Sequence, residues 1–362
     1  MNIFKRYRRK DSVIVIICFL SLIVAGAAYK VLRDKELFVH RENFINRADR
    51  GFKYIELECN HSLSIVGLLN AFFDASEDVS RDEFEIFTRD LLKEYPFIKA
   101  LEWVPRVKKN ERFSFEQDAR RDGMENYEFL YRKDDNELYR IEEKSEYFPV
   151  YYIEPYSGYE GILGYDLSSD SELYSEMRSS WVTGKSLVVA DNFESGFNAL
   201  KEFLIITPVY DRKSASFIPS GREEGLKGFI LGFLNFISLI DDSFRHNEFP
   251  GIDFHLYDIT DGTDSASFIM SINGSDGEKS TDWSEKKLLN VSDKLSMSNN
   301  RIYSMSHAFK FGERKWAVIA VSDENLLGEY LTYQPVIVSL SIILIGGMFS
   351  FLFHGQIKKN NR

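Results

Sequence analysis

The stretch SVIVIICFLSLIVAGAAY, residues 12–29, and the stretch PVIVSLSIILIGGMFSFLF, residues 335–353, contain no charged residue. Because an α-helix rises 1.5 Å per residue, each would extend about 27–29 Å, which is close to the thickness of the hydrocarbon core of a bilayer. Five basic residues lie within the first ten residues and three within the last nine, with no acid among either set. By the positive-inside rule, both termini face the cytoplasm. The sequence therefore predicts a two-pass protein of the cell (inner) membrane with residues 30–334 extracytoplasmic.

Two features of these hydrophobic stretches leave alternatives open. Ala25-Gly26-Ala27 has the small-residue spacing that a signal peptidase accepts, so the first stretch is either a retained span or a cleaved signal peptide. In the second stretch, Gly346 and Ser350 either form a small-xxx-small face for close helix packing or are ordinary small residues of a span.

The composition excludes several classes of protein. The chain has 362 residues, of which 44% are hydrophobic and 28% charged, and this predicts a folded chain with one large or two ordinary domains. Without Asp11 and the terminal cations, 37 basic residues face 55 acidic ones, so we expect no nucleic-acid partner. Cys18 and Cys59 are the only cysteines, too few for a disulfide scaffold or a cysteine zinc module. We expect Cys59 to be either a small buried hydrophobe or the site of an intermolecular disulfide.

A long helix is predicted after the first span. Apolar residues recur at a spacing of seven, and a second partial seam accompanies them: Val31, Phe38, Ile45, Phe52, Cys59, Val66 and Phe73, with Ala48, Ile55 and Leu69. This stripe either packs on the helix's own domain or pairs with a second copy in a homodimer, and both can hold along different parts of its length.

Helices and strands alternate beyond this stalk. Ser80 and Glu83 match a capping box for a helix that stops at Tyr95-Pro96, and Ser168 and Ser169 offer N-caps for a helix that ends near Gly184. Two further helices are predicted over 110–122 and 237–245. Strands are predicted over 98–107, 127–131, 147–153, 162–167, 186–189, 202–210 and 227–235, then over 252–259, 267–272, 301–310 and 315–321, with a loop over 273–300.

Several stretches resemble the CHASE domain, the extracellular sensory module of cyclase and histidine kinase receptors. They are YPFIKALEWVPRV (95–107), ERFSFEQDARRDG (111–123), YFPVYYIEP (147–155), GILGYDLSSD (161–170), TGKS (183–186) and ITPVY (206–210). The resemblance implies an α+β fold: a long N-terminal helix followed by two PAS-like subdomains, flanked by two transmembrane helices. The resulting organisation is a cytoplasmic N-terminus (1–11), a span (12–32), a stalk (33–79), a membrane-distal subdomain (80–246), a membrane-proximal subdomain (247–331), a second span (335–353) and a cytoplasmic tail (354–362).

The resemblance also implies a small-molecule ligand in the membrane-distal subdomain. Tyr152, Glu154, Tyr165 and Thr207 fall on predicted strands that should border the pocket, where polar tips would orient a planar ligand over an apolar floor. Trp103 and Arg106 belong to a family motif and are either ligand contacts or structural, with the Trp in the core and the Arg paired with a carboxylate. Asp166 is expected to order the turn before the following helix.

The sequence motifs typical of catalytic sites are incomplete or missing in this sequence. The TGKS segment lacks the first glycine of a P-loop, no HExxH or GxSxG is present, and the six histidines are scattered. We therefore expect no enzyme, no catalytic residues, no metal and no cofactor. Nine residues follow Phe353, so the expected output is a separate histidine kinase or cyclase. The rival interpretation is a structural or remnant receptor that does not signal.

Overall fold

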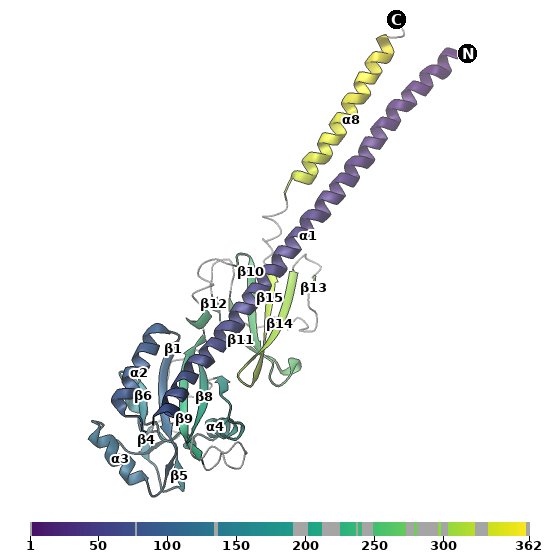
Figure 1. Cartoon of the computed structure of the whole chain (residues 1–362). Helices are drawn as coiled ribbons and strands as arrows, with labels where there is room; N and C mark the ends of the chain where they lie inside the picture. The colour runs from purple at the N-terminus through teal and green to yellow at the C-terminus, as the bar shows by residue number, and fades with distance from the viewer. Residues whose placement is uncertain are drawn as a thin grey trace. The chain divides into compact units, whose positions relative to one another are not determined.

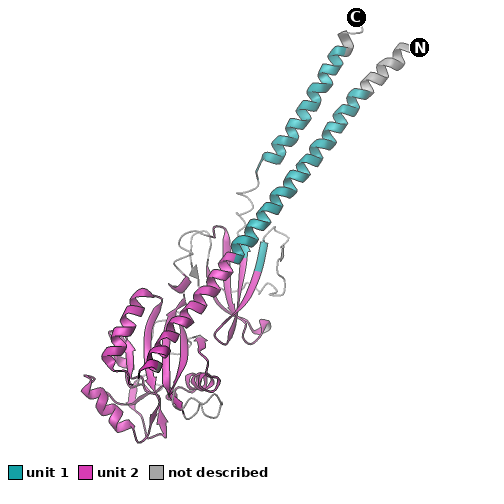
Figure 2. Cartoon of the chain, in the orientation of Figure 1, with its two compact units in different colours: residues 1–49, 295–305, 321–362 teal, residues 50–294, 306–320 magenta. Residues whose placement is uncertain are grey.

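The computed structural model describes residues 2–76, 78–133, 137–190, 202–211, 225–236, 238–240, 249–272, 279–280, 296–297, 303–322 and 332–359. These residues form an α+β structure with two main antiparallel sheets (Figure 1). The chain divides into two compact units, residues 1–49, 295–305 and 321–362 in one, and residues 50–294 and 306–320 in the other (Figure 2). The predicted helix over 237–245 and loop over 273–300 lie largely outside the described residues.

The long N-terminal helix predicted from the heptad pattern is confirmed as α1, Asn2–Ala75. In the larger unit its stripe is buried, with Phe52, Cys59, Leu69 and Phe73 each at most 5% exposed. The Phe52 ring meets the Phe254 ring edge-on at a centroid distance of 6.1 Å. This part of the stripe therefore packs on its own domain, as one of the two interpretations predicted, and burial raises the pKa of the Cys59 thiol.

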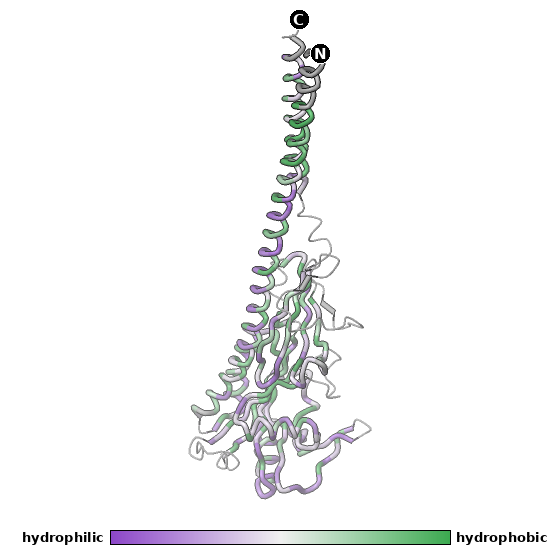
Figure 3. Tube along the Cα trace, turned by 90° about the vertical axis from the view of Figure 1, so that its right-hand side faces the viewer, coloured by the Kyte–Doolittle hydropathy of each residue, from purple (hydrophilic) through white to green (hydrophobic). Residues whose placement is uncertain are grey.

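In the smaller unit, the early part of the same stripe remains accessible. Val31 is 66% exposed and Phe38 is 59% exposed. The N-terminal part of α1 and the C-terminal helix α8 (Gln334–Lys359) are the two described helices long and apolar enough to cross a membrane (Figure 3).

Small residues allow α8 and the first hydrophobic stretch to approach closely. The Ser339 hydroxyl donates to the Ala25 carbonyl at 3.0 Å, and Cys18 Sγ lies 3.3 Å from Ser350 Oγ. A Cβ added at Gly346 would lie 2.5 Å from Ser21 Cβ. The small-xxx-small face is therefore a packing surface for the first stretch of the same chain.

The first main sheet has the strand order β6-β1-β9-β8-β7, with every neighbouring pair antiparallel. Its strands are β6 (Tyr152–Glu154), β1 (Ile98–Pro105), β9 (Leu226–Asn235), β8 (Glu202–Tyr210) and β7 (Leu187–Ala190). One face packs on α4 (Ser171–Thr183) through Leu173, Met177 and Trp181. On the other face, α1 contributes Phe73, whose ring lies 4.2 Å from that of Trp103.

The second main sheet has the order β12-β11-β10-β15-β14-β13. Its strands are β12 (Lys279–Ser280), β11 (Ser267–Ile272), β10 (Ile252–Asp258), β15 (Arg314–Ser322), β14 (Tyr303–Phe311) and β13 (Ser296–Met297). The strands predicted in this half of the chain, over 252–259, 267–272, 301–310 and 315–321, are therefore confirmed to within about two residues.

Short elements flank the first sheet. They are α2 (Arg81–Glu94), α3 (Arg112–Arg121) and two small ladders, β2 (Val107–Lys108) with β5 (Glu146–Tyr147) and β3 (Leu130–Arg132) with β4 (Leu138–Arg140). The capping box of α2 is confirmed, because the Glu83 amide donates to the Ser80 hydroxyl and the Ser80 amide donates to the Glu83 carboxylate.

Three local predictions are wrong. The strand predicted over 147–153 is interrupted, and only its ends lie in strands, β5 and β6 (Tyr152–Glu154), because the Phe148 amide donates to the Asp166 carboxylate and the Val150 amide to the Tyr165 carbonyl. Residues 162–167 form no strand but two isolated bridges between 3₁₀ turns, since Gly164 has a φ of +79° and a Cβ there would lie 2.0 Å from the Glu128 carbonyl oxygen. The N-cap of α4 is Asp170 rather than Ser168 or Ser169, because its carboxylate accepts the amides of Glu172 and Leu173. The predicted end at Gly184 is confirmed, with a φ of 70°.

Candidate ligand-binding site

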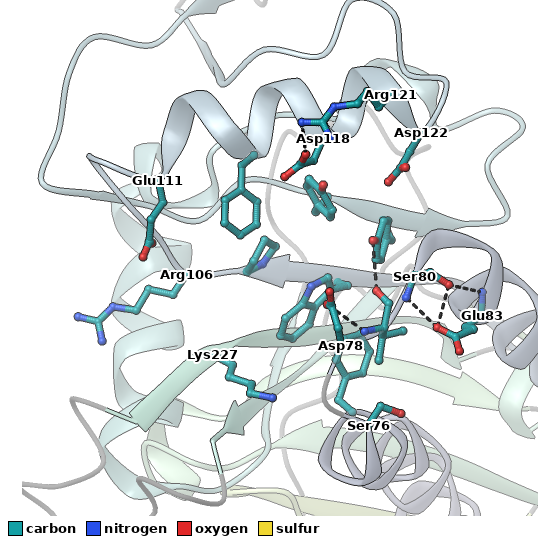
Figure 4. Close-up of a pocket in the computed structure, with 17 residues that line it drawn as sticks. Ser76, Asp78, Ser80, Glu83, Arg106, Glu111, Asp118, Arg121, Asp122 and Lys227 are labelled. Atoms are coloured by element: carbon teal, nitrogen blue, oxygen red, sulfur yellow. Dashed lines mark hydrogen bonds and ion pairs between the residues drawn. The ribbon is translucent and has the colours of Figure 1, made fainter.

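A cavity of about 700 Å³ lies beside the first sheet, within the larger unit (Figure 4). Its walls come from the end of α1, the segment that leads into α2, and parts of β1, β6, β9 and α3. The lining residues are Phe73, Ser76, Asp78, Val79, Ser80, Glu83, Trp103, Pro105, Arg106, Glu111, Phe115, Asp118, Arg121, Asp122, Tyr151, Tyr152 and Lys227.

Aromatic rings form one continuous wall of this cavity. Phe115 meets Tyr151 edge-on at 5.5 Å between centroids, and Tyr151 lies 4.7 Å from Tyr152. The Tyr152 hydroxyl donates to the Val79 carbonyl at 3.2 Å, which fixes the ring against the segment that enters α2. Such a wall suits a flat apolar ligand, because aromatic faces stack on planar groups.

Tyr151 differs from its neighbour in hydrogen bonding. Its side chain is 7% exposed, and its hydroxyl has no hydrogen-bond partner among the described residues. Burial raises the pKa of this phenol, and the carboxylates of Asp122, Asp118 and Asp78 raise it further. The hydroxyl therefore keeps its proton at neutral pH and can act as a hydrogen-bond donor or acceptor.

Most of the other charged groups in the lining already take part in ion pairs or hydrogen bonds within the protein. Arg121 pairs with Asp118 at 2.8 Å, and the Glu111 carboxylate accepts the Lys108 amide at 2.9 Å. Within the described parts of the chain, the side chains of Asp122 and Lys227 make no hydrogen bond or ion pair. These two groups are available to a ligand from opposite parts of the lining (Figure 4).

Three of the six predicted site residues line this cavity: Trp103, Arg106 and Tyr152. Trp103 is 8% exposed and packs on α1, so it contributes an edge of the floor. The Arg106 guanidinium pairs with Glu146 at 2.7 Å and lies 4.5 Å from the Trp181 ring centroid. Its charge is therefore already partnered, as the structural interpretation of this residue predicted.

The other three predicted residues lie elsewhere. The half-buried carboxylate of Glu154 accepts the Tyr156 amide at 3.2 Å, and burial raises its pKa. Tyr165 packs against the core cluster beneath α4, and the Thr207 and Ser186 hydroxyls share a 2.9 Å hydrogen bond. The structure does not bring these three to the cavity.

The contribution of α3 to the cavity was not predicted from the sequence. Phe115, Asp118 and Asp122 follow one another at spacings of three and four, which places them on one face of a helix. That face lines the cavity, so the signal was present in the ERFSFEQDARRDG stretch. Tyr151 and Lys227 depend on tertiary contacts and had no comparable signal.

Glu102, the residue before Trp103, carries a buried carboxyl group on the opposite face of β1. Glu102 is fully buried on the same face as Ala100 and Val104, which belong to the core cluster beneath α4. Neither of its carboxyl oxygens has a hydrogen-bond partner within the part of the chain that the structure describes. Burial raises the pKa of Glu102 to about 8, so this group is largely protonated at neutral pH. Within the described residues, no group of His, Cys, Asp and Glu side chains is placed to hold a metal ion.

Comparisons with known proteins identify the region around the cavity. A family model, the CHASE domain, matches residues 77–269. A hybrid signal transduction histidine kinase A from Dictyostelium discoideum is 23% identical over 94% of this chain, and the chain spans 16% of that relative's length.

Two solved structures show weaker likeness. The periplasmic sensory domain of the Campylobacter jejuni chemoreceptor Tlp1 is 14% identical, with a TM-score of 0.41 over 84% of this chain and 99% of the other. An extracellular ligand binding receptor from Desulfohalobium retbaense is 10% identical, with a TM-score of 0.39 over 80% of this chain and 40% of the other. Since the CHASE model covers more than half of the residues, the chain belongs to the CHASE domain family.

Proposed function

We propose that this chain is a membrane-anchored extracytoplasmic sensor that binds a small molecule in the cavity beside the first sheet. The observation that carries this proposal is that Phe73, in the last turn of α1, and Ser76, just beyond its end, line the cavity. The same helix begins at Asn2 and contains the charge-free stretch 12–29. A ligand in the cavity would therefore touch the helix that enters the membrane.

The transmission step follows from linkage. A ligand shifts the balance between two packings of α1 only by its difference in affinity for them, so a 100-fold preference supplies about 2.7 kcal/mol. We propose that α8 serves as the second anchor against which α1 moves, because small residues let the two helices pack closely. The exposed Val31 and Phe38 suit contact with a second copy in a homodimer.

The proposed output is phosphotransfer or nucleotide cyclisation. CHASE modules belong to receptors of the histidine kinase and cyclase types, and the Dictyostelium relative is named as a histidine kinase. Among the six residues predicted from the sequence, we propose Trp103, Tyr152 and Arg106 as ligand contacts, because they line the cavity. Glu154, Tyr165 and Thr207 remain predictions outside this cavity.

Filling the cavity is expected to abolish ligand-dependent stabilisation. The full-length chain in lipid nanodiscs would be screened by thermal shift against amines, amino acids, carboxylates and adenine derivatives. A ligand at 100 times its Kd should stabilise the protein by about 2.7 kcal/mol. In Ser76→Trp the indole would occupy the cavity, and the shift should disappear. Ser114→Trp is the matched control, since Ser114 is exposed on α3 and does not line the cavity.

Two results would contradict this function. One is the failure of every compound to shift the unfolding of the wild-type chain. The other is a shift that survives Ser76→Trp at full size, which would move the ligand away from the cavity.

A further inference from the structure

Charge is distributed unevenly along the cavity. The carboxylates of Asp122, Asp118 and Asp78 all raise the pKa of Tyr151. Asp118 and Asp122 lie at the α3 side of the cavity, and Lys227 lies across the lining from them (Figure 4). Asp118 forms an ion pair with Arg121, and among the described residues Asp78 and Asp122 form none. The end of the cavity near α3 is therefore electronegative.

Exposed aspartates alone are commonly a solvated face, but here a second observation points to a ligand. Tyr151 is more than nine-tenths buried, and its hydroxyl has no partner among the described residues. The hydroxyl oxygen is not among the fully buried polar atoms, and Tyr151 lines the cavity, so the hydroxyl is open to a molecule bound there. A donor from a bound molecule would satisfy it.

The aromatic wall indicates which chemical group carries that donor. The faces of Phe115 and Tyr151 carry the negative side of a ring quadrupole, which attracts cations. These rings adjoin the carboxylates, so a positive charge would be favoured by both at once. A protonated amine supplies the charge and three N–H donors, and a flat apolar body attached to it would cover the rings.

We propose, building on the ligand cavity assigned above, that its ligand is a protonated amine on an aromatic or similarly flat apolar body. The ammonium group lies between the Asp122 carboxylate and the Tyr151 hydroxyl. The flat body lies along the aromatic wall towards Trp103. Lys227, which makes no hydrogen bond or ion pair within the described residues, receives an acidic or hydrogen-bond-accepting substituent at the far end.

Three probes of one shape test this assignment by isothermal titration calorimetry on the full-length chain in nanodiscs: benzylamine, 4-(aminomethyl)benzoate and benzoate. We expect both amines to bind at least about tenfold more tightly than benzoate, since one well-placed charge contact is worth about a factor of ten. Asp122→Asn should weaken both amines by about tenfold, and Lys227→Met should weaken 4-(aminomethyl)benzoate but not benzylamine. Asp90→Asn removes an exposed carboxylate that does not line the cavity and should change nothing.

The outcomes separate this inference from the proposed function. If benzoate binds more tightly than the two amines and Ser76→Trp abolishes its binding, the ligand is not an amine. The cavity would then still be a ligand site. No binding of any probe would also overturn it, while the metabolite screen with Ser76→Trp decides the proposed function independently. Tyr151→Phe should weaken the amines severalfold without changing the melting temperature much, because the hydroxyl it removes has no partner among the described residues.

Discussion

Glu102→Gln is expected to stabilise the protein at neutral pH by about 3 kcal/mol and to flatten its loss of stability towards alkaline pH. The Glu102 carboxyl is fully buried and has no hydrogen-bond partner among the residues that the structure describes, and burial raises its pKa from an ordinary value of 4.5 to about 8. A raised folded-state pKa means that the folded state binds the proton more tightly than the unfolded state. The stability that this proton contributes is complete below pH 4.5 and is lost as the pH rises to about 8.

The magnitude follows from the size of the pKa difference. Each unit corresponds to about 1.4 kcal/mol, so between pH 4.5 and pH 7 the loss is roughly 3 kcal/mol, and by pH 8 it approaches 5 kcal/mol. Glutamine has no proton to lose, so its variant avoids this loss. Glu102→Leu should stabilise further, because it also removes the unsatisfied polar atoms.

Melting temperatures of the detergent-solubilised full chain at pH 5 and pH 8.5 check this prediction. The wild-type protein should lose several degrees over this interval, and Glu102→Gln should lose clearly less. Glu125→Gln, at an exposed position, is the control and should follow the wild-type profile. A Glu102→Gln variant less stable than wild type at pH 8.5 would show that the ionised carboxylate has a favourable partner.

The second large effect has the opposite sign: Asp166→Ala should destabilise the larger unit by about 3–5 kcal/mol, the usual cost of removing one partner from a buried charged network. Asp166 is fully buried, but its carboxylate is well satisfied. One oxygen accepts the Phe148 amide at 2.8 Å and the Ser168 amide at 3.2 Å, and the other accepts from Lys144 Nζ at 3.1 Å.

Equilibrium unfolding in denaturant, followed by tryptophan fluorescence, measures this loss. Asp166→Asn should fall between wild type and alanine, because one amide oxygen can still accept the backbone amides while the new NH₂ group faces Lys144. Asp122→Asn, on the exposed surface of the same unit, should cost less than about 0.5 kcal/mol. A loss below 1 kcal/mol for Asp166→Ala would mean that the turn is ordered by other contacts.

The pair Glu102 and Asp166 shows which features the sequence predicts. Asp166 precedes two serines, and the role of such an Asp in ordering a turn is local, so the prediction is confirmed by its bond to the Ser168 amide. Glu102 interrupts the apolar run IKALEWV, and its burial depends on the strands that flank it, β6 and β9. Local signals cannot report whether a carboxyl on such a strand finds a partner.

In the fold and the cavity too, features that depend on neighbouring residues were predicted, and features that depend on tertiary contacts were not. The capping box of α2 and most strands were predicted because they depend on spacing within a few residues. The strand over 162–167 was wrong because Gly164 must approach the Glu128 carbonyl, a contact made only in the folded chain. Trp103, Arg106 and Tyr152 lie in stretches that carry the family resemblance, whereas Lys227 enters from β9, 75 residues after Tyr152.

Topology is the claim on which the sensor proposal depends most, and cysteine labelling of whole cells tests it directly. Gln117→Cys lies exposed on α3, and His354→Cys lies exposed near the end of α8. Of the native cysteines, Cys59 is buried and Cys18 is half-buried, so labelling is compared with that of the protein without an added cysteine. With a membrane-impermeant maleimide that can reach the outer face of the inner membrane, we predict labelling of Gln117→Cys in intact cells and of His354→Cys only after permeabilisation. Labelling of Gln117→Cys only in permeabilised cells would contradict an extracytoplasmic sensor.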